Sequence, residues 1–237
     1  MSCNFAFPVA FDFGERVAAF DGEQITMGAI DPQNRAIFET YFNPPGAFAL
    51  SVPFFFERHR RFMLDYARLI NFGALVGSEP NGRVERAADL LNGQAFTWKL
   101  GERDRDHIRY ALGTLLEIGL AAGARRAVVP TQPGIEIALT AANVARFRQA
   151  IDAYPLVTTD LLLTTAHPQG GNVMAGPGVD AATRDARVVD DRFRVSGFDN
   201  VFVADASVFP TSLTVNPQWT IMAMSSLAST SVLELCP

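Results

Sequence analysis

Apolar residues recur at three-to-four spacing along the middle of the chain, a pattern typical of amphipathic helices. The longest such pattern predicts a helix over 104–122, followed by Gly123 at the position where a C-cap belongs. A second helix is predicted to begin after Thr140, a good N-cap residue, and to continue through Ile151. The basic cluster at 57–62 is followed by apolar residues at helical spacing, so we interpret it as the solvated face of a third helix.

Shorter apolar runs, broken by Pro and Gly, predict strands and turns. Strands are predicted at 125–130 and 155–166. A turn is predicted at Asp21-Gly22, because Gly accepts positive φ, and a hairpin is predicted to turn at 80–82. The proline pair at 44–45 predicts extended chain that enters a strand. This mixture predicts an α+β, or mixed α/β, fold in which helices cover an antiparallel sheet.

Composition narrows the class of protein. The 237 residues carry a formal net charge of −5 and 49% of them are hydrophobic, which describes a soluble globular protein without the basic stripe that a nucleic-acid partner needs. The 19 phenylalanines fit core filling or a large apolar substrate surface. No apolar run is long enough to span a membrane, and the N-terminus has no basic leader. Cys3 and Cys236 match no metal or redox spacing, so we expect a reducing, cytoplasmic location.

The candidate chemistry begins at TTAHPQGGN, where His167 follows a predicted strand and precedes two glycines. Taken alone, such a histidine is more often structural than catalytic. Downstream, VFVADAS predicts a strand that ends near Asp205, and a loop then leads to a helix that starts at Asn216 and Pro217. Singly, Asp205 also fits a solvated strand end, and Asn216 a simple helix cap. A helix N-terminus attracts developing negative charge, so together they form a plausible seat for an electron-accepting group.

The stretches HPQGGNVMAG, RVVDDRFRVSGFDNVFVADASVFPTS and VNPQWTIMAMSSLA together resemble the C-terminal signature of the glucose–methanol–choline (GMC) family of flavin oxidoreductases, in order and in spacing. Two earlier stretches, YFNPPG and EIGLAAGARRAVVP, are similar to the substrate domain of that family. The HPQGG form and the use of Asn216 favour its sterol-oxidase and long-chain-alcohol branches.

The resemblance implies FAD-dependent oxidation of an apolar alcohol by hydride transfer to the flavin. It implies that His167 accepts the alcohol proton, a task for which a neutral imidazole near pH 7 is suited. Asn216 would hydrogen-bond the substrate oxygen, and Asp205 and Ala206 would contact the ribityl–pyrophosphate part of FAD. The residues implied at the pyrimidine edge of the flavin are Asn216, Pro217, Gln218 and Thr220.

Members of this family begin with a strand, a Gly-x-Gly-x-x-Gly turn and a helix that cradle the FAD pyrophosphate. This sequence contains no such fingerprint. The resemblance therefore predicts a substrate-binding domain at 1–160 and, at 161–237, a C-terminal strand–loop–helix that completes an FAD-binding domain whose N-terminal Rossmann half is absent. Either a partner chain supplies that half, or the chain is a non-catalytic fragment or interaction subunit. The electron acceptor, whether oxygen, a quinone or a cytochrome, stays open.

Two other classes of protein fit the residues less well. A hydrolase that used His167 would need a Gly-x-Ser-x-Gly elbow to present its nucleophile, and the sequence has none. A zinc site built from His59, His107 and His167 matches no ligand spacing, so we expect no metal.

Overall fold

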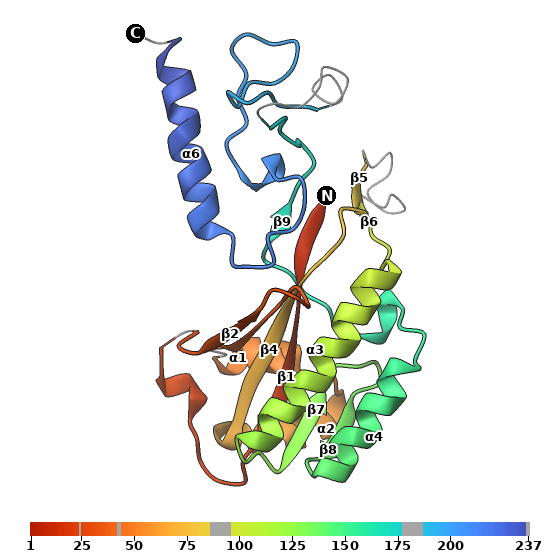
Figure 1. Ribbon diagram of the computed structural model, residues 1–237. Coiled ribbons are helices and arrows are strands. Elements are labelled where there is room, and N and C mark those ends of the chain that lie inside the picture. The colour runs from red at the N-terminus through yellow and green to blue at the C-terminus, as the bar shows by residue number, and fades with distance from the viewer. Residues whose placement is uncertain (24, 42–43, 86–95, 177–186, 236–237) are drawn as a thin grey trace. The chain divides into compact units, whose positions relative to one another are not determined.

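The computed structural model describes residues 1–237 except 24, 42–43, 86–95, 177–186 and 236–237. The chain divides into two compact units, shown as ribbons in Figure 1. The sheet unit comprises Phe5–Val76 and Leu100–Thr164, and the histidine unit comprises Met1–Asn4, Gly77–Lys99 and Thr165–Pro237. Because each unit is assembled from separate stretches, residues far apart in the sequence meet within each of them.

The main sheet runs in the order β2-β3-β4-β1-β7-β8. Its strands are β1 (Ser2–Asp12), β2 (Gly28–Asp31), β3 (Ala36–Tyr41), β4 (Leu69–Gly77), β7 (Arg126–Val129) and β8 (Ile135–Ala138). β3 pairs antiparallel with β4, with Tyr41 opposite Asn71, and β1 pairs antiparallel with β7, with Ala10 opposite Val128. The predicted antiparallel sheet in a mixed α/β fold is confirmed, and the strand predicted at 125–130 is β7.

One face of the sheet is covered by α3 (Glu102–Ala121) and α4 (Ala141–Asp152), both drawn in green in Figure 1. A Cβ on Gly119 of α3 would overlap the Phe11 ring of β1, so helix and sheet lie in close contact there. Both helices were predicted from their spacing, and their ends lie within about two residues of the prediction. Gly123 has the positive φ of a C-cap, and the Thr140 hydroxyl accepts a hydrogen bond from Asn143 N at 3.2 Å.

The opposite face carries α1 (Pro45–Ser51) and α2 (Phe56–Leu64). Their core consists of Phe48, Phe54 and Phe62 packed on Ala10, Leu69 and Val128 of the sheet. The amphipathic helix predicted at the basic cluster is α2. The prediction of extended chain after the proline pair is wrong, because Pro45 occupies the first helical position, where a missing N–H costs no hydrogen bond.

The turn predicted at Asp21-Gly22 is present as a short 3₁₀ turn that Asp21 ends, and the hairpin that follows it is the one between β2 and β3. The hairpin predicted at 80–82 is wrong. After residues 80–82 the chain forms β5 (Arg83–Val84), which pairs with β6 (Phe96–Thr97) rather than folding back on β4. A turn dipeptide makes a hairpin only where the two flanking runs can pair with each other.

Two predicted strands are also wrong, because neither segment has a neighbouring segment to pair with along its length. This holds among the residues that the structure describes. In 155–166 only Leu161 and Thr164 form bridges, each to a single residue, and a 3₁₀ turn interrupts the segment at Thr158–Asp160. In VFVADAS only Phe202 forms a bridge, to Arg194, and a 3₁₀ turn follows at Ala206–Val208. Among the described residues no neighbour runs alongside either segment far enough to build a ladder.

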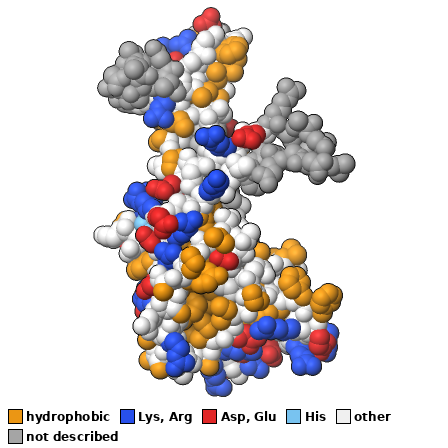
Figure 2. Space-filling view, turned by 90° about the vertical axis from the view of Figure 1, so that its right-hand side faces the viewer, with side chains coloured by type: hydrophobic (Ala, Val, Ile, Leu, Met, Phe, Trp, Pro, Cys, Tyr) orange, Lys and Arg blue, Asp and Glu red, His pale blue; other side chains and the backbone are white. Residues whose placement is uncertain are grey.

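The histidine unit contains β9 (Pro168–Gln169), which pairs with the start of β1, and the helix α6 (Gln218–Leu233). A small core of Val189, Phe193 and Ala228 lies between α6 and the loops. Cys3 is buried, and Cys236 lies outside the described residues. None of the described helices combines the length and the apolar character needed to cross a membrane. Figure 2 shows hydrophobic side chains interspersed with charged ones on one face of the molecule.

Candidate active site

His167 stands at the entrance to β9, in a turn that the sequence builds with glycine. The Thr165 hydroxyl accepts a hydrogen bond from His167 N at 3.0 Å. Gly170 has a φ of +74°, and a Cβ there would come within 3.2 Å of the Phe209 carbonyl oxygen. A side chain at this position would therefore be strained and crowded, which explains the glycine after HPQ.

The segment after His167 runs beside the segment that contains Asp205. Gly170 N donates to Ala206 O at 2.9 Å and Asn172 N to Ser207 O at 3.0 Å, while the Asn172 side chain donates to the Ser207 hydroxyl at 3.0 Å. Two of the three motifs that predicted a shared site are thus adjacent in space. Asp205 itself is exposed, and its carboxylate accepts from Ser207 N at 2.8 Å, which caps the 3₁₀ turn.

The third motif, VNPQWTIMAMSSLA, is joined to His167 through the side chain of Asn4. This residue was not identified from the sequence. Asn4 lies on β1 and is fully buried. Its side-chain nitrogen lies 3.2 Å from His167 Nδ1 and donates to the Val215 carbonyl at 2.9 Å. Its side-chain oxygen accepts from the Ser212 hydroxyl at 2.5 Å. A polar residue inside the apolar run SCNFAFPVAF was the available signal.

A second buried amide secures the same loop. The side chain of Gln169 is almost completely buried, and its oxygen accepts a hydrogen bond from Leu213 N at 3.0 Å. Buried polar side chains are normally satisfied in this way, and each such bond limits the freedom of the chain. Asn4 and Gln169 therefore hold 212–215 against the histidine turn.

The partners of Asn4 determine which nitrogen of His167 carries the proton. The Val215 carbonyl only accepts and the Ser212 hydroxyl donates, so the amide nitrogen faces Val215 and His167. Its second N–H then points to Nδ1, which must be the bare nitrogen. In the neutral imidazole the proton is consequently on Nε2.

Burial lowers the pKa of His167 below its ordinary value of 6.5. At neutral pH the ring is therefore uncharged, as general acid–base chemistry requires. Within the described part of the chain, no group of three or more His, Cys, Asp or Glu side chains is placed to hold a metal ion.

The start of α6 lies directly after this network. Helix α6 begins at Gln218, and its cap position is held by Pro217 rather than by the predicted Asn216. Asn216 is exposed, and Val215 O, immediately before it, is the acceptor of the Asn4 bond. The structure thus connects the His167 ring to the backbone next to Asn216. Convergence of the His167 and Asn216 side chains stays a prediction, as do the roles of Gln218 and Thr220.

Comparison with known proteins shows which family this chain resembles. The family model for GMC oxidoreductases matches residues 78–225, more than half of the chain. An uncharacterized GMC-type oxidoreductase of Sinorhizobium fredii is 36% identical over 135 residues, which are 57% of this chain and 25% of that protein. Two long-chain-alcohol oxidases of Arabidopsis thaliana are 24% identical over 195 residues and 26% identical over 231 residues, covering 81% and 92% of this chain. The chain spans only 25% and 29% of their lengths.

Proposed function

Because the chain belongs to the GMC oxidoreductase family, we propose that it supplies the substrate-binding and active-site part of an FAD-dependent enzyme that oxidises an apolar alcohol. The observation that supports this proposal best is the Asn4 network, which joins the His167 ring to the loop before α6 through one buried amide. The names of the plant relatives, long-chain-alcohol oxidases, support an alcohol with a large apolar part.

The residues present fit one end of FAD. Helix α6 has 16 residues, and the N–H groups of its first turn have no partner within the helix, so they suit the pyrimidine edge of a flavin that gains negative charge. The proposed contacts there are Asn216, Pro217, Gln218 and Thr220. Asp205 and Ala206, beside the histidine turn, are proposed for the ribityl–pyrophosphate portion. The pyrophosphate cradle of the family is not encoded in this sequence.

FAD, when bound, supplies the acceptor for the hydride that leaves the carbinol carbon. The task of His167 is to hold the alcohol oxygen and to take its proton. In the tautomer set by Asn4, Nε2–H donates to that oxygen and orients it. Proton uptake at Nε2 requires the other tautomer, and a half-turn of the Asn4 amide would present its oxygen to Nδ1. That turn leaves the Val215 carbonyl without its donor, which costs about 1–3 kcal/mol.

We assign residues 1–160 to substrate binding and 161–237 to the C-terminal part of the FAD-binding domain. The N-terminal half of that domain is proposed to pack on α6, which exposes several large apolar side chains. Trp219 is 80% exposed, Leu227 61% and Leu233 65%. So much exposed apolar surface on one helix is typical of an interface.

The same surface supports a second candidate function, a non-catalytic subunit that binds a partner through α6. Flavin chemistry separates the two. The chain is purified alone and together with the N-terminal half of a GMC enzyme, and flavin absorbance and its bleaching by 1-octanol are followed. For the enzyme, we expect His167→Ala in the complex to retain flavin but to slow bleaching about 100-fold or more. His59→Gln, a change in the sheet unit, is the matched control and should bleach normally. A complex that holds flavin but bleaches equally well without His167 refutes the catalytic assignment.

A further inference from the structure

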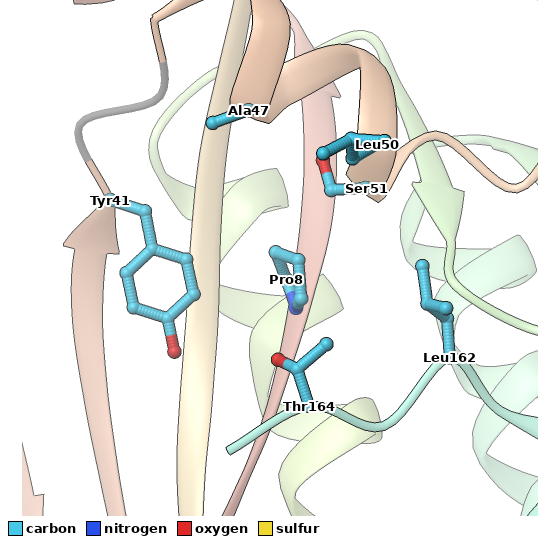
Figure 3. Close-up of a pocket in the computed structure, with 7 residues that line it drawn as sticks. All are labelled: Pro8, Tyr41, Ala47, Leu50, Ser51, Leu162 and Thr164. Carbon is cyan, nitrogen blue, oxygen red and sulfur yellow. The ribbon is translucent and has the colours of Figure 1, made fainter. Parts of the chain in front are cut away.

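The sheet unit contains a hollow of about 250 Å³ on the face that carries α1 (Figure 3). Its walls are largely apolar and come from β1, the end of β3, α1 and the segment before Thr165. They include Pro8, Tyr41, Leu50, Ser51, Leu162 and Thr164. By comparison, a dry cavity of about 150 Å³ holds one benzene molecule, and pockets for drug-sized ligands begin at about 300 Å³. The hollow therefore suits a single ring or a short chain.

One polar group in this wall lacks a partner among the residues that the structure describes. The Tyr41 hydroxyl is buried and makes no hydrogen bond to any of them. The other hydroxyls are engaged, since Ser51 donates to Phe48 O at 2.8 Å and Thr164 donates to Ala6 O at 3.2 Å. Ser51 also accepts from the Asn71 side chain at 3.1 Å. The wall thus offers one unmet donor in apolar surroundings, which costs free energy unless a ligand meets it.

The position of Tyr41 is built into the sheet. A Cβ on Gly73 of the neighbouring strand would overlap the Tyr41 ring, so the glycine makes room for the phenol to lie flat on β4. Figure 3 shows the ring standing along one side of the hollow, with its hydroxyl directed toward the end where Thr164 lies. Burial, together with the charge of Glu39, raises the pKa of Tyr41 far above its ordinary value. The hydroxyl is therefore protonated, and a donor, at any working pH.

We propose that this hollow binds a small apolar ligand with one oxygen atom, and that the Tyr41 hydroxyl donates a hydrogen bond to that oxygen. The ligand class, an apolar alcohol or the carbonyl compound made from it, rests on the proposed function. Both molecules carry the same kind of acceptor oxygen on an apolar body.

The test measures binding to the full chain by ligand-detected NMR and needs no flavin. The probes are benzyl alcohol, benzaldehyde and toluene, which share a ring and differ in the oxygen. We expect Tyr41→Phe to weaken binding of the alcohol, the aldehyde or both about five- to tenfold, the loss of one hydrogen bond, and to leave toluene unchanged. Which oxygenated probe responds identifies the substrate or the product as the ligand. Ala47→Phe, at the rim, should abolish binding of all three probes.

Tyr154→Phe changes a phenol that does not line this hollow and is the matched control. Circular dichroism and thermal unfolding confirm that each variant is folded. The proposal is overturned if Tyr41→Phe binds both oxygenated probes as tightly as the wild type, or if Ala47→Phe binds all three normally. If Tyr41→Phe does not weaken binding but flavin bleaching still depends on His167, only the proposed ligand site is refuted. If Tyr41→Phe weakens binding but bleaching does not depend on His167, only the proposed function is refuted.

Discussion

Asn4→Asp tests how the buried network controls the proton on His167. The substitution keeps an oxygen to accept from Ser212 and replaces the amide nitrogen by a second carboxylate oxygen. That oxygen then lies about 3.2 Å from His167 Nδ1, where the N–H donor was. A carboxylate accepts only, so the ring proton must move to Nδ1 and leave Nε2 bare.

The expected shift of the His167 titration follows from the distance between the side chain of residue 4 and His167 Nδ1. At 3.2 Å, Coulomb's law with an effective dielectric constant of about 20 gives roughly 5 kcal/mol between a carboxylate and an imidazolium. His167 is half-buried rather than enclosed, so we expect about half of that energy. The midpoint of the His167 titration should therefore move up by about two pH units. The Val215 carbonyl loses its donor, which should lower the free energy of unfolding by about 1–3 kcal/mol.

Histidine side-chain ¹⁵N NMR of the full chain measures both quantities. The chain has only 3 histidines, and the His167 resonances are identified by their loss in His167→Ala. The wild type should show a bare Nδ1 and a midpoint below 6.5, and Asn4→Asp a protonated Nδ1 and the higher midpoint. Asn172→Asp, the same change in the same unit on a side chain that bonds Ser207, should leave the midpoint almost unchanged. A wild-type ring protonated on Nδ1, or equal midpoints in wild type and Asn4→Asp, would refute the reasoning.

Three further predictions concern stability, each measured by urea unfolding. Gly119→Ala should lower the free energy of unfolding by about 2–3 kcal/mol, because its Cβ overlaps Phe11. Gly46→Ala, on α1 and with no described atom close to the new Cβ, should raise it by up to about 1 kcal/mol. Equal effects of the two substitutions would contradict the packing. Because burial lowers the pKa of His167, the unfolded chain takes up a proton at a higher pH than the folded chain does. The free energy of unfolding should therefore be highest above pH 6.5 and should fall below that pH by at most about 1.4 kcal/mol per pH unit. His167→Gln should reduce that slope, and an unchanged slope would count against the burial of His167. Tyr41→Phe should raise the free energy of unfolding by about 1–2 kcal/mol, since it removes a buried donor that has no partner within the described part of the chain. A loss of stability would reveal a bond to that hydroxyl.

The local sequence pattern was enough to predict an element wherever that element is stabilised by its own residues. The apolar spacing in 104–122 and the cap at Thr140 predicted α3 and α4, because a helix closes its hydrogen bonds within one segment. Family signatures such as HPQGG likewise indicated that His167 and the loop before α6 are candidate site residues. These features depend on neighbours a few residues away, and the sequence displays them directly.

Tertiary structure decided the features that depend on distant neighbours. The predicted strands at 155–166 and 201–207 lack a partner among the described residues, while Pro45, read as a break, begins α1 on the core of Phe48 and Phe62. Asn4 reaches His167 across 163 positions, and its burial and partners appear only when β1 lies between two loops. A hydrogen bond between residues so far apart has no periodic signature in the sequence. The position of the ring proton on His167 Nε2 is therefore decided by the fold.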